Sequence, residues 1–129
     1  MSRVMILFFL SLVLIPTGLA SGHPPDSIEL VFDSPKNVLQ VTVHHHVKDL
    51  GKHYVNQILV KLNGEKIIEQ KCKSQSDSRL QMVDYRIIDA RPGDEILVTV
   101  GCNISGRKKL KIVVKEEPEQ QEAGPGEGE

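Results

Sequence analysis

The residues in this sequence best suited to chemistry are its histidines, which are gathered in one short stretch of the chain. All five histidines lie between His23 and His53, and three of them are consecutive, namely His44, His45 and His46. Neutral imidazole is a good ligand for iron, zinc, copper or nickel. The cluster therefore predicts a binding site for a divalent metal ion. The alternative interpretation is a group of surface histidines near a loop.

The elements that must position these histidines are predicted to be β-strands. The triplet follows an expected strand over 38–43, and His53 begins the next expected strand. Because side chains alternate between the two faces of a strand, we expect His44 and His46 on one face and His45 on the other. A short connection then brings His53 back beside the triplet.

The two cysteines, Cys72 and Cys102, are the second candidates for chemistry. Cys102 lies beside a glycine in an expected tight loop, where it could serve as a thiolate ligand or a reactive thiol. In an oxidising compartment an even pair of cysteines indicates a disulfide instead. Both interpretations stay open at this point. The tripeptide from Asn103 to Ser105 also matches an N-glycosylation sequon.

Short segments rich in β-branched residues, separated by turn residues, extend over most of the chain. The segments expected as strands are 28–32, 38–43, 53–62, 65–70, 82–88, 95–100 and 108–114. Asn63-Gly64 is a strong hairpin signal, and no window shows a sustained helical period. The pattern predicts an all-β fold, an immunoglobulin-like antiparallel β-sandwich of about seven strands. A partly open barrel is the alternative.

The first twenty residues have the layout of a cleavable secretory signal peptide. Arg3 precedes an apolar run over 4–15, and small residues lead to an expected cleavage after Ala20. A retained membrane anchor is the alternative, but a spanning helix needs roughly 20 apolar residues. The sequence therefore predicts export to the periplasm or secretion, with no membrane association after cleavage.

The expected mature chain consists of one domain, residues 21–115, and an acidic tail, residues 116–129. The tail contains six of the 17 acidic residues, and its composition predicts disorder. The domain has 15 basic and 11 acidic residues, a mildly basic balance. This density of charge is well below that of a nucleic-acid-binding protein, so no nucleic acid is expected as a partner.

Several segments together resemble the iron-binding domain of desulfoferrodoxin and neelaredoxin, the superoxide reductases. In that family a His-x-Pro element is followed by a second histidine, a Glu-His-Tyr-Ile element, a Pro-Gly-Asp turn and a Cys-Asn-x-His-Gly loop. The matching segments here are His23-Pro24-Pro25, one of His44–His46, Lys52-His53-Tyr54-Val55, 89–95 and Cys102-Asn103-Ile104-Ser105-Gly106.

The resemblance implies an immunoglobulin-like sandwich that carries a non-haem iron, cycling between Fe2+ and Fe3+. Imidazoles would lie in the plane of the iron, a cysteine thiolate would bind axially, and superoxide would be reduced to peroxide at the open position. The ligands carried over are His23, His44 or His46, His53, and Cys102. An electron-donor protein is an implied partner.

The sequence also departs from the family pattern. Ser105 stands where the family has its last histidine, so that His45 or another member of the triplet would have to substitute. Ser21-Gly22 replaces a Glu-Lys pair whose lysine attracts superoxide in the family. These departures favour the alternative of a non-catalytic binding or accessory module, which has lost the metal centre and has a disulfide between Cys72 and Cys102.

A third interpretation depends on the cleavage site. Cleavage after Ala20 would leave Ser21-Gly22-His23 as a free amino terminus. Its amine, two deprotonated amides and the imidazole could bind Cu(II) or Ni(II) in a square plane, the geometry that these ions prefer.

Overall fold

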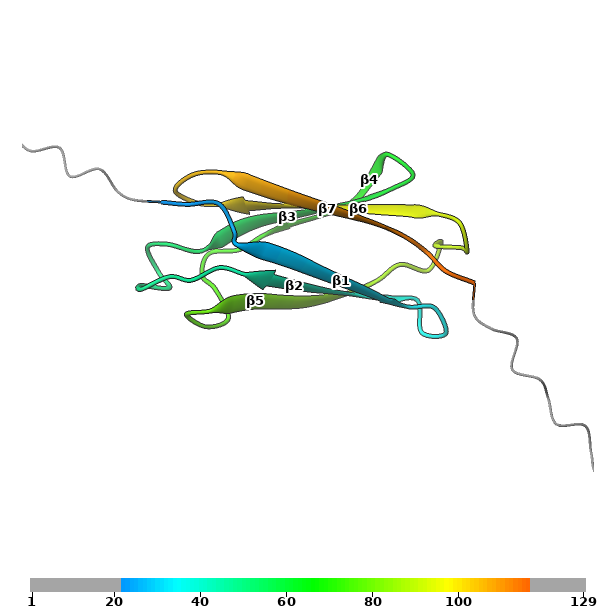
Figure 1. Ribbon diagram of the computed structural model, residues 1–129, viewed down its shortest axis with the longest axis horizontal. Coiled ribbons are helices and arrows are strands. Elements are labelled where there is room, and N and C mark those ends of the chain that lie inside the picture. Colours follow the sequence, from blue (N-terminus) through cyan, green and yellow to red (C-terminus); the bar gives the residue numbers. More distant parts are fainter. Residues whose placement is uncertain (1–21, 117–129) are drawn as a thin grey trace, which may run out of the picture.

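In the computed structural model the described residues, 22–116, form seven antiparallel β-strands and no helix (Figure 1). The strands are β1 (Ser27–Asp33), β2 (Val38–His44), β3 (Val55–Leu62), β4 (Glu65–Lys71), β5 (Leu80–Arg86), β6 (Glu95–Cys102) and β7 (Arg107–Val113). The predicted all-β fold and strand number are confirmed.

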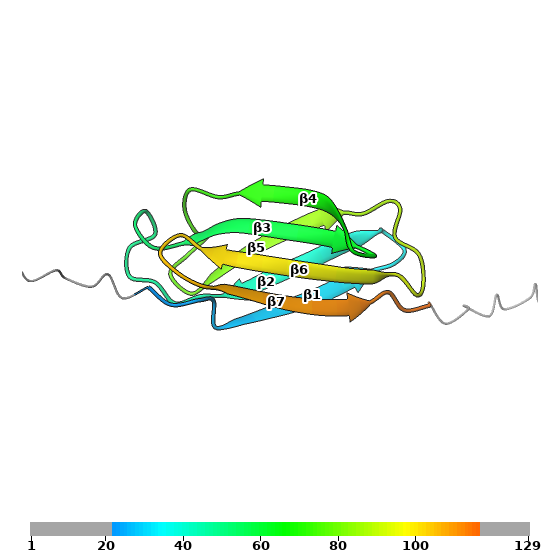
Figure 2. The same cartoon turned by 90° about the horizontal axis from the view of Figure 1, so that it is seen from above.

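The strands form two sheets that pack face to face, as Figure 2 shows. One sheet has three strands in the order β1-β2-β5, and the other has four in the order β4-β3-β6-β7. Strand β1 of the first sheet runs beside β7 of the second at one edge. The two sheets stay separate, so the fold is the predicted sandwich rather than the partly open barrel.

The core between the sheets is built from aliphatic side chains that alternate along the central strands. On β2 the inward residues are Leu39, Val41 and Val43, each at most 1% exposed. The inward residues of β6, Ile96, Val98 and Val100, are fully buried. Burying a side chain of this kind stabilises the fold by about 1.5–3 kcal/mol, so these two strands contribute much of its stability.

The turn at Asn63-Gly64 joins β3 to β4 as the sequence predicts. Both residues have a positive φ, of 49° and 86°, which is the conformation that a two-residue hairpin turn of type I′ requires. This turn lies at the end of the sandwich opposite to the histidines.

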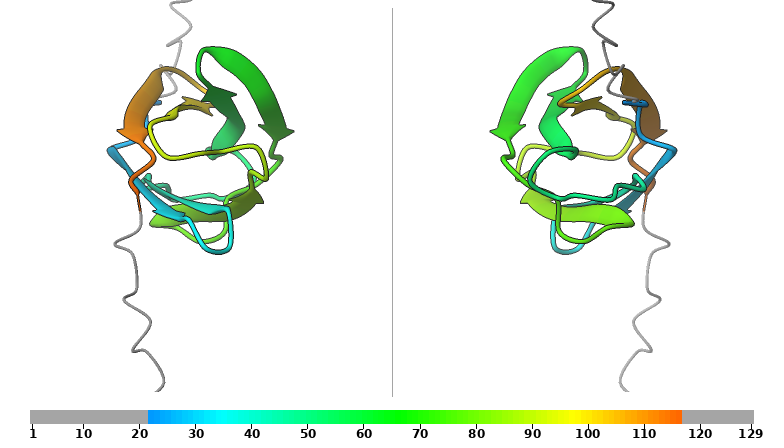
Figure 3. Two further views of the ribbon diagram at one scale, coloured as in Figure 1. Left: turned by 90° about the vertical axis from the view of Figure 1, so that its right-hand side faces the viewer. Right: turned by 90° about the vertical axis from the view of Figure 1, so that its left-hand side faces the viewer.

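One end of the sandwich collects the segments that contain the histidines. Ser27 of β1 pairs with His44 at the end of β2, and Val55 at the start of β3 pairs with Cys102 at the end of β6. The right-hand view of Figure 3 looks at this end, where the connection from β2 to β3 crosses from one sheet to the other.

The predicted signal peptide, residues 1–20, lies outside the described residues, as does the predicted tail from residue 117 onward. Both stay predictions. Within residues 22–116 no helix is long and apolar enough to cross a membrane.

Candidate metal centre

Three imidazoles meet at the end of the sandwich, and they come from three different segments. His23 precedes β1, His45 directly follows β2, and His53 lies in the connection that leads into β3. One ligand atom from each ring lies within 4.8 Å of those of the other two. The ring centroids are 4.9 Å (His23–His45), 5.1 Å (His23–His53) and 4.7 Å (His45–His53) apart. We call these three residues the histidine group.

His45 enters the group because it continues the inward face of β2. Val41 and Val43 point into the core, and His45 is two residues further along the same face. Its side chain is fully buried, with 0% exposure. The expectation that His45 lies on the opposite face from His44 and His46 is consistent with these burial values.

The other two members of the triplet lie outside the histidine group. His44 places its Nε2 3.3 Å from an oxygen of Glu29 on the outer side of the three-stranded sheet. His46 is 75% exposed in its side chain, and its Nδ1 is 3.7 Å from Asp26 Oδ2. Among the predicted ligands, the structure therefore brings together His23 and His53, and the triplet contributes its middle member.

His53 has a buried ring nitrogen and a lowered pKa. Its Nε2 is buried and has no hydrogen-bond partner, which is also true of His44 Nε2 outside the group. Burial lowers the pKa of His53, as do the nearby rings of His45 and His23, whereas a contact with the His23 backbone acts in the opposite direction. A lowered pKa keeps the ring neutral near pH 7, and neutral imidazole is the form that binds a metal ion.

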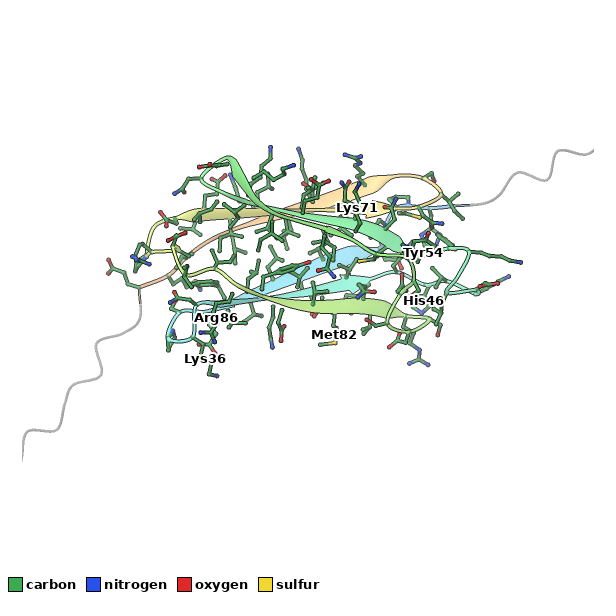
Figure 4. All side chains as sticks on the ribbon, turned by 180° about the vertical axis from the view of Figure 1, so that it is seen from behind. Lys36, His46, Tyr54, Lys71, Met82 and Arg86 are labelled. Atoms are coloured by element: carbon green, nitrogen blue, oxygen red, sulfur yellow. The ribbon has the colours of Figure 1, made fainter. Side chains whose placement is uncertain are left out.

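Asn103 holds the backbone on both sides of His53. Its Nδ2 donates to the carbonyl oxygen of Lys52 (2.9 Å), and its Oδ1 accepts from the backbone N–H of Tyr54 (2.8 Å). Its own backbone N–H donates to the Tyr54 carbonyl (3.0 Å). Figure 4 labels Tyr54 and His46, which flank this end of the sandwich. Since Nδ2 is engaged, a glycan on this sequon would disrupt the contact with Lys52.

The residues before β1 are held against the loop between β6 and β7. Gly106 has a φ of 83°, and a Cβ atom at this position would lie 2.7 Å from Pro24 Cβ. A Cβ atom on Gly22 would meet Ile104 at 2.2 Å, and the Ser105 hydroxyl at 3.2 Å. The close approach of these backbones places the segment containing His23 next to the β6–β7 loop, which includes Ser105.

Cys102 lies at the same end but outside the histidine group. It is 8% exposed at the end of β6, and its Sγ is 3.9 Å from Asn103 Oδ1. Among the described residues, the set whose ligand atoms all lie within 4.8 Å of one another consists of the three histidines. Cys102 is thus a buried thiol outside this set of ligand atoms.

Cys72 and Cys102 are both free thiols. Cys72 follows β4, and its backbone N–H donates to Asn56 of β3, whereas Cys102 pairs with β3 from the other side. Two strand spacings, about 10 Å, therefore separate the cysteines, and a disulfide needs Cα atoms within about 7 Å. The structure does not support the predicted disulfide alternative. Burial raises the pKa of the Cys72 thiol.

A surface hollow of ≈ 320 Å³ opens onto the histidine group. It is lined by His23, His46, Val47, Lys48, Asp49 and His53. A small molecule could reach two of the three imidazoles from solvent through this hollow.

The donor set of the histidine group suits a first-row divalent metal ion. Imidazole binds zinc, copper, iron and nickel, with metal–nitrogen bonds of about 2.0–2.1 Å for zinc. Ligand atoms from three rings that all lie within 4.8 Å of one another form a group that could hold such an ion. The buried, unpartnered Nε2 of His53 fits this arrangement. The group can therefore hold a metal ion.

Comparison with known proteins supports the fold. No family model matches the sequence, and no curated protein matches it in sequence. Among solved structures, the chain is similar to a superoxide reductase (1Fe-SOR) from Giardia intestinalis, with a TM-score of 0.50 and 16% identity. The match covers 72% of this chain and 98% of the other. It shows that this chain has a superoxide-reductase-like β-sandwich.

Proposed function

We propose that this protein is an exported iron-binding protein whose metal site is the histidine group, and that it reduces superoxide. The observation that carries the proposal is the convergence of His23, His45 and His53 at one end of a superoxide-reductase-like fold. The buried and unpartnered Nε2 of His53 supports it, because an unpaired polar atom costs free energy that a bound metal ion would recover.

Each residue of the site has a distinct part in this proposal. The three imidazoles would hold the ion, and the deprotonated Cys102 thiolate would be a fourth donor, as the family resemblance implies. When bound, ferrous iron supplies one electron to superoxide, which with two protons becomes hydrogen peroxide. The hollow beside His23 and His53 admits the small anion, and its lining contains one lysine, Lys48, and one carboxylate, Asp49.

The proposed partners and location depend on features outside the site. The signal-peptide layout of residues 1–20 supports export to the periplasm or secretion. In that compartment an electron-donor protein would return the iron to its ferrous form. N-terminal sequencing of the mature protein tests the cleavage after Ala20, and with it the alternative of Cu(II) or Ni(II) binding at Ser21-Gly22-His23.

A second candidate function is a binding module that keeps the fold without a metal ion. Two observations favour it: Ser105 occupies the position of the family's last histidine, and the Cys102 sulfur lies outside the histidine group. This alternative no longer includes the disulfide, because the structure has two free thiols.

Metal analysis of the mature chain separates the two functions. We expect anaerobically purified protein to bind one iron per chain, and His45→Gln or His53→Gln to abolish binding. His44→Gln is the matched control, since His44 lies on the outer side of the sheet, and it should bind normally. A wild-type chain that takes up no Fe(II) would leave the binding module as the function.

The same preparation tests whether Cys102 is a ligand of the iron. If its thiolate ligates, the oxidised protein shows a thiolate-to-iron charge-transfer band in the visible spectrum, and Cys102→Ser removes the band but not the iron. Iron bound without this band would contradict the part given to Cys102 and leave a site of imidazoles alone. Catalysis is measured as superoxide-dependent oxidation of the ferrous protein, with peroxide as the product.

A further inference from the structure

Gln75 is a buried polar residue in the loop between β4 and β5 and contacts the histidine group from the interior. It is 4% exposed. Its Oε1 lies 2.9 Å from His45 Nδ1 and also accepts from the backbone N–H of Val55 at 3.3 Å. His45 belongs to the end of the three-stranded sheet, and Val55 to the start of β3 in the other sheet. Gln75 therefore links the two sheets at the candidate site.

The orientation of the Gln75 amide follows from its other two contacts. Its Nε2 lies 2.7 Å from the carbonyl oxygen of His45 and 2.9 Å from that of Asp77. Carbonyl oxygens only accept hydrogen bonds, so the atom between them must be the NH2 group with its two donors. The other amide atom, which faces His45 Nδ1, is therefore the carbonyl oxygen.

This orientation determines where the proton of a neutral His45 resides. Gln75 Oε1 can only accept, so Nδ1 of His45 carries the hydrogen that it donates. A neutral imidazole has one N–H, and the other ring nitrogen, Nε2, then has a free lone pair. Nε2 lies 3.3 Å from the carbonyl oxygen of His23, an acceptor that would take a hydrogen bond only if Nε2 had the proton. The Gln75 side-chain oxygen and the His23 carbonyl oxygen thus compete for one imidazole proton, and the Gln75 oxygen is the closer of the two.

We infer that Gln75 is a positioning residue that holds His45 in the Nδ1–H form and keeps its Nε2 unprotonated for a metal ion. The assignment of the tautomer stands on the hydrogen bonds alone, whereas its consequence for metal binding rests on the proposed function. Ligating histidines commonly donate their second N–H to an acceptor that orients the ring, and loss of that acceptor costs about 10–100-fold in metal affinity. Neither the fold nor the family resemblance assigns this part to Gln75.

The direct test is the protonation of His45 in the full, metal-free chain, read from the imidazole 15N chemical shifts. The His45→Gln variant identifies the signals. We expect the shifts of an Nδ1–H tautomer in the wild type at pH 7.5. Shifts typical of an Nε2–H tautomer would overturn the inference, whether or not the protein binds metal.

Two substitutions separate positioning from a general structural effect. Gln75→Met removes the acceptor at nearly constant volume, and we expect the His45 proton to move to Nε2, where the His23 carbonyl accepts it. Gln75→Glu keeps an acceptor for Nδ1–H but loses the amide donors to His45 and Asp77. Gln75→Glu should therefore lose stability yet retain the Nδ1–H tautomer. An unchanged tautomer in a folded Gln75→Met variant would contradict the inference.

Metal titration then distinguishes this inference from the proposed function. If wild type binds Fe(II) or Zn(II), we expect about 10–100-fold weaker binding in Gln75→Met and binding close to wild type in Gln75→Glu. Equal losses of metal affinity in both variants would mean that Gln75 acts only through the stability of the fold. If wild type has the Nδ1–H tautomer but binds neither ion, the proposed function fails and the part of Gln75 in setting the tautomer stands.

Discussion

The centroids of the His45 and His53 imidazole rings lie 4.7 Å apart, and the two rings are nearly perpendicular, at an interplanar angle of 89°. The two residues are joined to different sheets, His45 to the end of β2 and His53 to the connection into β3. Their meeting therefore depends on how the sheets pack at this end of the sandwich. Changes to the contacts that hold these segments should affect the site as well as the stability of the fold.

Asn103→Ala should loosen the backbone around His53. The substitution removes the side-chain hydrogen bonds to Lys52 and Tyr54 and leaves a partly buried N–H unpaired, at a cost of about 1–3 kcal/mol. Urea unfolding measures this loss. Gln57→Ala, which removes an exposed hydrogen bond to Glu69, is the control and should cost far less. Equal losses in the two variants would argue against a special contribution from Asn103.

Gly106→Ala should be more destabilising than Gly64→Ala, although both glycines have a similar positive φ. Alanine in this conformation costs about 1–2 kcal/mol at either position. No atom surrounds the Cβ position of Gly64 within 4 Å, whereas that of Gly106 meets Pro24 at 2.7 Å. Thermal unfolding of the two variants gives the comparison. Because Pro24 follows His23, only Gly106→Ala should also weaken metal binding.

Stability should rise with pH between about pH 5 and pH 7, in part through His53. Its pKa is lowered in the folded protein from the ordinary value of 6.5, so below that value the unfolded chain binds more protons. Lowering the pH through 6.5 therefore favours unfolding, until the folded-state pKa is passed. Urea unfolding at both ends of this pH range tests whether stability rises with pH. In His53→Gln the free energy of unfolding should differ less between the two pH values. An unchanged difference in the free energy of unfolding would contradict the assignment to His53.

Both cysteines should be found as thiols in the folded protein. Their attachment to opposite sides of β3 keeps them about 10 Å apart, beyond the reach of a disulfide. Alkylation in denaturant without reducing agent, followed by mass spectrometry, should label two thiols per chain. A peptide linked through Cys72 and Cys102 would show that the sheet is paired differently from the structure described here.

Ser105→His should strengthen metal binding by adding a fourth imidazole. The Ser105 hydroxyl is 3.2 Å from the Cβ position of Gly22, so a histidine there would project from a position beside the residue that precedes His23. Isothermal titration with Zn(II) under anaerobic conditions measures the change. Ser105→Gln, with a side chain of similar length that is a poor ligand, is the control. Equal affinities in the two variants would indicate that the added ring does not reach the ion.

The strands and their inward faces could be predicted from the sequence because both depend on local patterns. β-branched residues, turn residues and the Asn63-Gly64 pair indicated the seven strands and the β3–β4 hairpin. The alternation of Leu39, Val41 and Val43 extends to His45, so the middle histidine of the triplet was marked as inward by a pattern already present in the sequence. Following that apolar alternation past the end of β2 would have favoured His45 over His44 and His46 as the group member.

The sequence by itself determined a sandwich with a cluster of histidines at one end, because period-two burial and turn chemistry are local properties. Only the tertiary structure decided which ring nitrogens converge and which groups hold them. The contact of Gln75 with His45 joins residues 30 apart, and that of Asn103 with Lys52 joins residues 51 apart. Such contacts have no local signature, since they exist only once the two sheets are packed. The same packing leaves the Cys102 sulfur outside the histidine group.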